Sequence, residues 1–493
     1  MMNLAEAVSH HARARPTHAA LIHGERTLDY RALDAAVDRQ AAALATLGAR
    51  EGDLLGLALK DTIEHVIFFY ALARLGLVIL PMDWRWSDEE KAKIANHFQA
   101  RFVLVEPGAE VPGLPCVAVG ADWSVRAANA PTVAAYPRGG DLPLLVSLSS
   151  GTTGRPKGPR LTHHQFFRRF MTHWINLGLN AGDRYVSATP LYFGGGRTFA
   201  MSVLFSGGTV VLFPPPYEPA ALVREIARRE ATSLFLVPTL LRRLLELEPK
   251  QAAPLQALRL LLSSGSALHP DERRAIRSHL CPRFFEYYAS TEGGGVSLLT
   301  PGDQETRGDS VGRPVFGVDV EIVDDAHAPV AAGEIGRLRY RGPGVATGFF
   351  GEAEDDPETF RDGWFYPGDL ASLDEAGYVY LKGRRKDVII RGGVNIYPTD
   401  IEFVLAEHPA VAEAAVIAVP DQEFGEQIAA FAVMKGPARA EELMGWCRER
   451  LAAYKVPRWI YAVPKLPRNR GGKVMKAKLL EAAFAAPQPG DQR

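Results

Sequence analysis

Short apolar runs, rich in β-branched and aromatic residues, alternate with amphipathic stretches over most of the chain. The runs have the length of buried strands, and they span residues 54–59, 102–105, 144–146, 209–213, 233–237 and 258–263. Residues 219–230, between two of these runs, have helical periodicity. Strands that alternate with helices pack as layers around parallel sheets. The pattern therefore predicts an α/β fold with layered sheets.

The pattern changes between residues 322 and 380, where short strands are separated by turn clusters such as Gly342-Pro343-Gly344. This change predicts a small β subdomain at about residues 310–385. Residues 382–387 are charged and lack apolar periodicity, and helix and strand patterns resume after them. Because 493 residues exceed what one hydrophobic core usually supports, we place a domain boundary there. We expect an N-terminal domain of residues 1–385 and a small α+β C-terminal domain of residues 386–493.

Charge and cysteine content narrow the classes of partner and compartment. Basic side chains number 56 against 57 acidic ones, which offers no electrostatic footprint for nucleic acid or an anionic membrane. The most apolar segment, 66–82, is interrupted and short, so we predict a buried helix leading into a strand and no membrane span. The chain opens without a secretory signal pattern. Isolated cysteines are typical of buried thiols in a reducing cytoplasm, and here they are Cys116, Cys281 and Cys447. The sequence leaves homo-oligomerisation open.

Residues 149–158 gather hydroxyls, glycines and one lysine directly behind the apolar run 144–146. Glycines let backbone N–H groups approach phosphate oxygens, hydroxyls add donors, and Lys157 adds positive charge. A Walker A loop needs Ser or Thr directly after its lysine, whereas Gly158 follows Lys157. A flexible linker is the alternative, but it would lack the buried strand before it. We predict a polyphosphate-binding loop made by Ser149, Ser150, Gly151, Thr152, Thr153, Gly154 and Lys157.

Further motifs follow this loop in a fixed order, and with it they cover roughly residues 145–476. They are Gly265-Ser266-Ala267, Tyr288-Ala289-Ser290-Thr291-Glu292, Tyr366-Pro367-Gly368-Asp369, Gly383-Arg384-Arg385-Lys386-Asp387, Gly392-Gly393 and Pro467-Arg468-Asn469-Arg470-Gly471-Gly472-Lys473. The ordered set resembles the core motifs of the adenylate-forming (AMP-binding) superfamily, and its acyl-CoA synthetases in particular. The resemblance implies ATP, Mg²⁺ and CoA as ligands and a C-terminal domain that is mobile. It also implies that a carboxylic acid is first converted to an acyl-AMP and then passed to a thiol.

Two of the motifs have the chemistry of a base-binding slot. The small side chains of Gly265, Ser266 and Ala267 let a flat base lie against the backbone, and Tyr288 offers an aromatic face for its other side. Ala289 stands where the superfamily usually has glycine, which loosens the expected stacking geometry. We expect the adenine here.

Two acidic motifs supply the ribose and metal contacts. Asp369 can accept both ribose hydroxyl protons, and Arg384 offers a rigid fork of donors to the ribose or the α-phosphate; the resemblance assigns both to the ribose. Glu292, next to Thr291, would be repelled by phosphate oxygens unless a cation lay between them, so Mg²⁺ is implied with Glu292 as its ligand. Each acid taken alone could also be a solvated turn carboxylate.

Lys473 is the expected catalytic lysine, together with Thr291 and Glu292. In the superfamily the matching lysine bridges the substrate carboxylate and the α-phosphate. A preorganised ammonium would offset the repulsion between these two anions as the carboxylate attacks phosphorus. The alternative is a surface lysine in a basic tail, because several other basic residues lie nearby in the sequence.

The thiol step needs other groups at the same acyl carbon. In the superfamily the C-terminal domain swings to exchange the catalytic lysine for a thiol tunnel. Lys386 matches the hinge position, and Gly393 matches the glycine whose missing side chain lets pantetheine pass. A solvated loop lysine and a plain turn glycine are the alternatives.

The acyl pocket is expected around residues 189–196, with Tyr192, Phe193, Gly194 and Gly293 as its lining. Amino-acid-activating relatives carry aspartate where this chain has Phe193, so α-amino acids are disfavoured. Phe193 makes an apolar wall, which favours an aromatic or otherwise hydrophobic acid. The two triple-glycine runs, 194–196 and 293–295, remove side-chain volume near this pocket, although a triple glycine is as often a turn. Arg197 could pair with a second carboxylate, although a solvated arginine at a helix start is the favoured interpretation.

Three functions compete at this point. An ATP-dependent acyl-CoA ligase uses every motif. An acyl-AMP ligase would load the phosphopantetheine of a separate carrier protein. A non-catalytic nucleotide or acyl-adenylate binder would show decay at Glu292, Asp369, Arg384 or Lys473, and all four chemistries are present.

Overall fold

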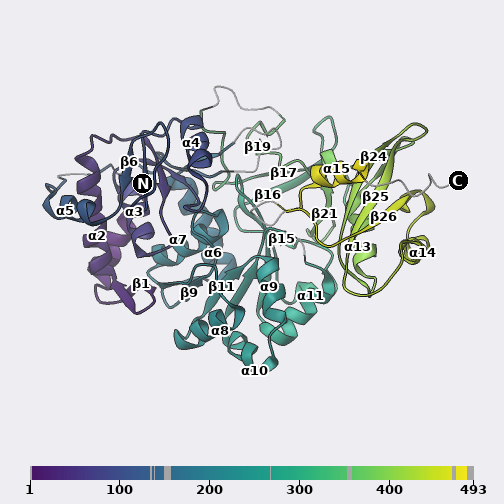
Figure 1. Ribbon diagram of the computed structural model, residues 1–493, viewed down its shortest axis with the longest axis horizontal. Helices are drawn as coiled ribbons and strands as arrows, with labels where there is room; N and C mark the ends of the chain where they lie inside the picture. Colours follow the sequence, from purple (N-terminus) through teal and green to yellow (C-terminus); the bar gives the residue numbers. More distant parts are fainter. Residues whose placement is uncertain are drawn as a thin grey trace.

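The computed structural model describes residues 3–133, 136–137, 139–148, 157–266, 268–351, 358–468 and 474–485. In Figure 1 a broad body that contains the N-terminus fills the left and centre of the view, and a smaller lobe that leads to the C-terminus lies at the right. The predicted fold class, a large N-terminal domain of layered sheets and a small C-terminal domain, is confirmed. The boundary at residue 385 stays a prediction.

The larger sheet of the N-terminal body has nine strands, which are, in sheet order, β15 (Arg313–Pro314), β14 (Gly294–Leu299), β13 (Phe284–Ser290), β12 (Leu260–Ser263), β11 (Ser233–Leu236), β9 (Arg184–Ser187), β10 (Thr209–Leu212), β1 (Ala19–His23) and β2 (Arg26–Asp29). From β13 to β1 neighbouring strands run parallel. The strands β14, β15 and β2 add antiparallel edges. The apolar runs 209–213, 233–237 and 258–263 therefore form the centre of a parallel sheet, as predicted.

The second sheet has six strands, which are, in sheet order, β6 (Cys116–Ala118), β5 (Phe102–Val105), β3 (Leu54–Ala58), β4 (Val78–Pro81), β7 (Pro143–Val146) and β8 (Arg160–Thr162). The strands are parallel from β6 to β7, and β8 is antiparallel. The segment 66–82 falls largely in the buried helix α3 (Ile63–Arg74) and in β4, as predicted.

Helices cover and join the two sheets: α1 (Glu6–Ala14), α2 (Tyr30–Ala45), α4 (Asp88–His97), α5 (Ala121–Asn129), α6 (His163–Leu177), α7 (Gly194–Ser206), α8 (Pro219–Arg228), α9 (Pro238–Leu245), α10 (Pro249–Ala252), α11 (Pro270–Ala275) and α12 (Asp303–Thr306). One continuous cluster of buried residues draws on both sheets and on α2, α3, α6 and α7. The ends of α6 and α7 are set locally. Thr162 and Gln165 form a reciprocal capping box at the start of α6, and glycines with positive φ, Gly178 and Gly207, end the two helices.

The β subdomain is an antiparallel six-stranded sheet of β16 (Asp319–Val323), β17 (Gly336–Arg341), β18 (Phe360–Arg361), β19 (Trp364–Phe365), β20 (Asp369–Leu373) and β21 (Val379–Arg384). Its buried face includes Leu338, Tyr340 and Val379, which cluster with Val296 of β14. The subdomain is thus packed onto the edge of the nine-stranded sheet.

The C-terminal lobe contains β22 (Ile389–Arg391), β23 (Val394–Ile396), β24 (Val411–Asp421), β25 (Gly425–Met434) and β26 (Trp459–Val463), with α13 (Pro398–Ala406), α14 (Ala440–Arg450) and α15 (Lys476–Ala485). It contacts the rest of the chain through α13. The Thr399 hydroxyl donates to the Lys382 carbonyl at 2.9 Å, and the rings of Phe403 and His269 lie 5.6 Å apart. The mobility of this lobe stays a prediction.

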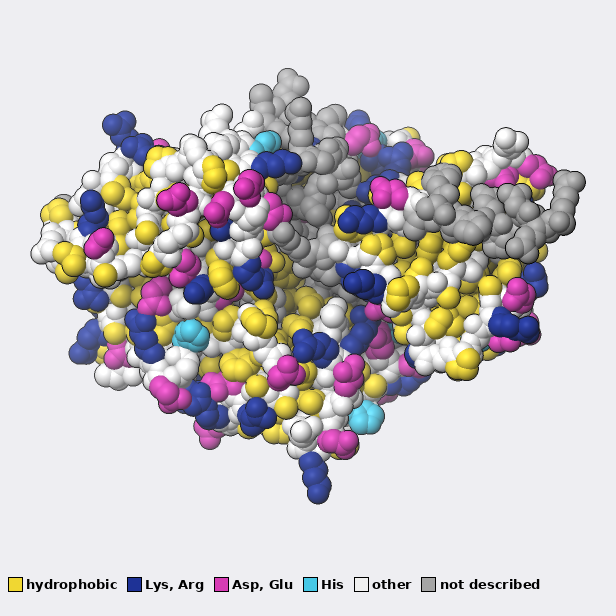
Figure 2. Space-filling model, in the orientation of Figure 1, with side chains coloured by type: hydrophobic (Ala, Val, Ile, Leu, Met, Phe, Trp, Pro, Cys, Tyr) yellow, Lys and Arg dark blue, Asp and Glu magenta, His cyan; other side chains and the backbone are white. Residues whose placement is uncertain are grey.

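Surface and thiol chemistry agree with the sequence in part. Figure 2 shows basic and acidic side chains interspersed over the face in view. Among the described residues, no helix is long and apolar enough to cross a membrane. All three cysteines are free; Cys281 and Cys447 are buried as expected, whereas Cys116 is partly exposed.

Candidate active site

The predicted site residues lie where parallel strands end. β7 ends just before the predicted phosphate loop, β9 ends before the segment 189–193, β12 ends before Gly265, and β13 ends directly before Thr291 and Glu292. The carboxyl ends of β9, β12 and β13 lie at one edge of the nine-stranded sheet, whereas β7 belongs to the six-stranded sheet. Ligands of α/β proteins bind at the carboxyl ends of such strands. The fold therefore gathers motifs that are far apart in the sequence.

Three of the predicted nucleotide residues are in direct contact. Asp369 and Arg384 are opposite each other on β20 and β21, and the Arg384 Nε lies 2.8 Å from Asp369 Oδ1. The Tyr288 hydroxyl donates to Asp369 Oδ2 at 2.5 Å. Burial, reinforced by the Asp369 charge, raises the pKa of Tyr288 well above its ordinary value, so the tyrosine stays a neutral donor. The hydroxyl contact was not expected, because the sequence suggested only a ring face for Tyr288.

The backbone around Gly265 leaves room for a flat group. Its φ is +107°, a conformation that favours glycine. A Cβ placed there would have its nearest neighbour, a Val237 methyl, at 3.9 Å. A side chain would therefore be strained and would fill the space that the predicted base needs.

The Thr291–Glu292 turn is held by Arg169 of α6, a residue that the sequence reasoning missed. Arg169 donates to the carbonyls of Thr291 at 3.2 Å, Glu292 at 2.6 Å and Gly344 at 2.8 Å. The arginine is 6% exposed, and burial lowers its pKa to about 10, so it remains charged at neutral pH. It links the turn to Gly344, beyond β17. The sequence feature that could have identified Arg169 is a charged residue within the apolar stripe of the 163–177 helix.

The Glu292 carboxylate is suited to a cation. Within the described ranges it carries no hydrogen bond or ion pair, while its backbone carbonyl is fixed by Arg169 and by the Ala346 N–H at 2.8 Å. Carboxylate oxygen is the donor type that Mg²⁺ prefers. No group of three His, Cys, Asp or Glu side chains that could hold a metal ion occurs in the described part of the chain. If Glu292 binds Mg²⁺, phosphate oxygens and water can supply further ligands.

Several predicted site residues fall outside the described residues, and their roles stay predictions. They are Ser149, Ser150, Gly151, Thr152, Thr153, Gly154, Ala267 and Lys473. Lys157 is described, and its ammonium lies 4.9 Å from the centre of the Phe349 ring.

Three of the predicted acyl-pocket residues, Tyr192, Phe193 and Gly194, lie at the start of α7. Phe193 is the N-cap residue, and the rings of Tyr192 and Trp86 lie 6.0 Å apart at an angle of 67°. A Cβ at Gly194 would have only Ser147 Oγ near it, at 4.0 Å, so space is open there. At Gly293 the corresponding point lies 2.4 Å from Tyr340 Cε2. The volume that Gly293 leaves is therefore occupied by the protein itself.

The favoured interpretation of Arg197 as a solvated residue was wrong. Arg197 is 1% exposed. It donates to the carbonyls of Leu191 at 3.1 Å and Tyr192 at 2.8 Å, and to the Ser147 hydroxyl at 3.2 Å. Its Nε has no hydrogen-bond partner among the residues that the structure describes. Because the guanidinium turns back onto the 189–193 segment, it lies beneath the loop instead of in solvent.

The two residues expected to act in the thiol step are Lys386 and Gly393. Lys386 belongs to the short 3₁₀ turn Arg385–Asp387. Gly393 has a φ of +82°, and no atom lies within 4 Å of a Cβ placed there. In this arrangement of the lobes, Gly393 stands in the open β22–β23 hairpin turn, and its role in the thiol step stays a prediction.

Comparison with known proteins decides the family. The AMP-binding enzyme family matches residues 8–350, and the AMP-binding enzyme C-terminal domain matches residues 400–473. The chain belongs to this family. The match extends through the phosphate loop, the strand ends and the turn that holds Glu292.

Relatives of this AMP-binding enzyme are similar over nearly their full length. A 2-succinylbenzoate–CoA ligase of Bacillus licheniformis is 32% identical over 471 residues, covering 95% of this chain and 98% of the relative. A feruloyl-CoA synthase of an Amycolatopsis species is 32% identical over 481 residues, covering 95% and 96%. The solved o-succinylbenzoate CoA synthetase of Bacillus subtilis, in complex with its acyl-adenylate intermediate, has a TM-score of 0.88 at 28% identity, covering 97% and 98%. The AMP-binding enzyme is accordingly an AMP-forming acid–CoA ligase.

Proposed function

We propose that this ligase converts an aromatic or otherwise hydrophobic carboxylic acid, not an α-amino acid, to its CoA thioester through an acyl-AMP. The contact of Tyr288 and Arg384 with Asp369 supports the proposal most directly. Tyr288 lies near the end of β13, the strand that leads to Glu292. The contact supplies nucleotide-binding groups beside a carboxylate that suits Mg²⁺. The B. subtilis relative has also been solved with ATP and a magnesium ion, which supports the same ligands here.

In the first half-reaction a carboxylate oxygen of the acid attacks the α-phosphorus of ATP. The new O–P bond forms as the bond to the β-phosphate oxygen breaks, and pyrophosphate leaves. Lys473 offsets the repulsion between the two anions, and residues 149–154 with Lys157 hold the departing phosphates. Bound Mg²⁺ would neutralise phosphate charge beside Glu292. Asp369 and Arg384 hold the ribose, and Arg169 keeps the Thr291–Glu292 turn in position.

In the second half-reaction the thiol sulfur of CoA attacks the acyl carbon, the C–O bond to AMP breaks, and AMP leaves with the electron pair. AMP is a far better leaving group than the oxide or hydroxide of a free acid. We propose that the C-terminal lobe, from residue 386, moves about Lys386 to bring Gly393 to the acyl carbon. The open position of Gly393 in this structure fits the state before that movement. Free cysteines and the use of ATP and CoA favour the cytoplasm.

The substrate class rests on the surroundings of Phe193. Its ring takes the place of the aspartate that would hold an ammonium group, so an amino acid would bring an unpaired charge into an apolar pocket. The curated relatives act on aromatic acids according to their names, 2-succinylbenzoate and ferulate. Both observations favour an acid with an apolar body.

Half-reaction assays test the proposal. We expect carboxylate-dependent pyrophosphate release, and thioester only when CoA or a carrier-protein phosphopantetheine is added; comparing the two acceptors identifies the natural one. Lys473→Ala should abolish adenylation and spare thioester formation from supplied acyl-AMP, whereas Gly393→Leu should do the reverse. A broad carboxylate panel that releases no pyrophosphate would refute the ligase, and equal loss of both steps in both variants would refute the domain movement.

A further inference from the structure

A wall of aromatic rings stands behind the predicted acyl pocket. The Phe199 ring lies 4.5 Å from that of His173 and 4.9 Å from that of Phe235, and the Tyr287 ring lies 6.0 Å from His173 and 6.2 Å from Phe199. Each of these four residues is at most 4% exposed. The aromatic wall, His173, Phe199, Phe235 and Tyr287, is therefore a continuous part of the core.

The wall occupies the volume that two pocket glycines leave. A Cβ at Gly195 would lie 2.8 Å from Phe235 Cε1 and Cζ, and 3.3 Å from Phe193 Cε1. A Cβ at Gly295 would lie 1.6 Å from the Tyr287 hydroxyl oxygen. At these two glycines the volume that a side chain would need is therefore filled by rings of the protein. Open space remains at Gly194, one residue before Gly195.

The wall carries no charge at neutral pH. Burial, with the nearby Arg169 charge, lowers the pKa of His173 to about 3, so its imidazole is neutral. Burial raises the pKa of Tyr287 to about 12, and its hydroxyl lies 3.0 Å from the Thr172 hydroxyl. Such a surface offers ring faces and edges, which suit a planar aromatic group, and it offers no ionic partner.

We propose that Phe235, with Tyr287 behind it, ends the acyl pocket just beyond Gly195 and makes the enzyme selective for compact, planar acids. These are acids whose single aromatic ring is joined to the carboxylate directly or through a short link. Unbranched medium-chain and long-chain acids would have to displace buried rings, which a packed core resists. This inference rests on the proposed function and adds the depth of the pocket and the residue that sets it.

Wild-type selectivity gives the first test, by pyrophosphate release with benzoate, cinnamate, octanoate and palmitate as probes. We expect kcat/KM to be at least about tenfold higher for the aryl acids than for the alkanoates. Equal or better use of octanoate or palmitate would overturn the pocket-depth inference and leave the ligase activity standing. Release with none of the four probes, nor with the broad panel, would instead count against the proposed function.

Variants at the wall give the second test. Phe235→Ala should lower the benzoate-to-octanoate ratio of kcat/KM by about tenfold or more, and the milder Phe235→Leu should shift it in the same direction. Phe284→Ala is the matched control, because Phe284 is also fully buried in a strand of the same sheet but belongs to a different core cluster. It should lower stability and leave the ratio unchanged. An unchanged ratio in both Phe235 variants would contradict the inference.

Close packing between Gly195 and Phe235 allows a rescue experiment. Gly195→Ala alone should raise KM for benzoate, because the added methyl overlaps the Phe235 ring. Adding Phe235→Leu should restore the benzoate KM toward the wild-type value. Failure of the second change to restore it would show that the two residues do not share the wall of the pocket.

Discussion

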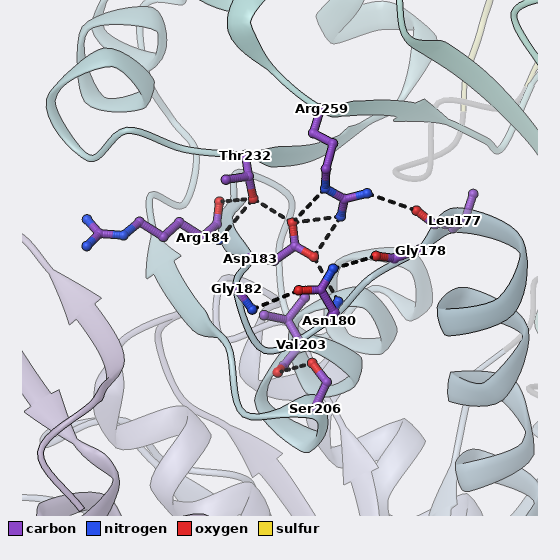
Figure 3. Close-up of polar contacts among 10 residues, drawn as sticks. All are labelled: Leu177, Gly178, Asn180, Gly182, Asp183, Arg184, Val203, Ser206, Thr232 and Arg259. Atoms are coloured by element: carbon purple, nitrogen blue, oxygen red, sulfur yellow. Dashed lines mark hydrogen bonds and ion pairs between the residues drawn. The ribbon is translucent and has the colours of Figure 1, made fainter. Parts of the chain in front are cut away.

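In the nine-stranded sheet, a buried charge is partnered differently at the edge where the parallel strands begin and at the edge where they end. At the edge where the parallel strands begin, Asp183 is 1% exposed and lies 2.6 Å from an Arg259 nitrogen. It also accepts from the Thr232 hydroxyl at 2.6 Å and the Asn180 N–H at 2.8 Å. Figure 3 shows this carboxylate surrounded by its donors. The network joins the residues that precede β9, β11 and β12.

At the edge where these strands end, Arg197 is buried without an acidic partner among the described residues. Its pKa is lowered to about 9 by burial and by the Arg169 charge, so it is still charged at neutral pH. It also lies in the first turn of α7, where a helix already presents positive potential. The fold thus neutralises the buried Asp183 at the first edge, and at the second it leaves Arg197 without an acidic partner among the described residues, next to predicted sites for anionic ligands.

The largest expected effect is at the second edge, at Glu292. Glu292→Gln keeps the backbone carbonyl that Arg169 holds but removes the charge for Mg²⁺. We expect pyrophosphate release to fall several hundred-fold, about 3–4 kcal/mol in activation free energy, with little change in melting temperature. In a Mg²⁺ titration, the rate of pyrophosphate release by Glu292→Gln should depend less on the Mg²⁺ concentration than the wild-type rate does. Glu305→Gln, at an exposed ion pair, is the control. An equal loss of pyrophosphate release in that variant would contradict the assignment of Glu292 to Mg²⁺.

A matched pair of variants tests the comparison between the edges directly. Arg259→Met leaves Asp183 buried and charged, and breaking such a pair should cost about 3 kcal/mol of unfolding free energy. Arg197→Met leaves only neutral carbonyls and a hydroxyl without a donor, and it should cost about 1–2 kcal/mol. Urea unfolding measures both values.

In activity assays, we expect the opposite order: Arg197→Met should be the more impaired of the two variants. Arg197 fixes the carbonyls of Leu191 and Tyr192 beside the predicted pocket, so Arg197→Met should raise the acid KM. Folded Arg259→Met should keep the wild-type kcat/KM. If Arg259→Met were the less active and the more stable of the two, the assignment of the edges would be wrong.

The strand ends and their motifs could be predicted because they are encoded locally. Apolar runs such as 209–213 and 258–263 identify the strands, and the residues just after β12 and β13 are those for which the sequence predicts the chemistry. Arg169 and the aromatic wall could not be found this way. Arg169 acts on carbonyls more than a hundred residues away, and Phe235 fills the space of Gly195 only through tertiary packing. A triple glycine alone does not say whether a ligand or the protein occupies its space.

The third prediction concerns the charge of Asp61. Its carboxylate accepts a hydrogen bond from the Leu191 N–H at 2.7 Å, and Arg197 donates to the carbonyl of the same leucine. Burial, then the Asp83 charge, raises the pKa of Asp61 from 3.8 to about 6. Between these two pKa values Asp61 is ionised in the unfolded chain and still protonated in the folded one. The stability of the fold therefore falls as pH rises through this window, by on the order of 3 kcal/mol in total.

Asp61→Asn should keep the contact with Leu191 and remove the charge. We expect the variant to be more stable than the wild type at about pH 8, with the gain vanishing toward about pH 4. Urea unfolding of both proteins at several pH values between about 4 and 8 measures this difference in stability. Asp141→Asn, whose carboxylate is 91% exposed, should show no such trend. A constant difference at every pH would mean that the Asp61 charge does not limit stability.

The smallest expected effect is at the ribose cluster. Tyr288→Phe removes one donor from Asp369 and leaves the Arg384 ion pair in place, so the carboxylate stays positioned but is less constrained. We expect KM for ATP to rise about fivefold, which corresponds to about 1 kcal/mol, with the acid KM unchanged. Tyr378→Phe removes a similar hydrogen bond, to Asp303 at 2.6 Å, away from the predicted site. If both variants changed the ATP KM alike, the Tyr288 hydroxyl would matter to the fold and not to the nucleotide.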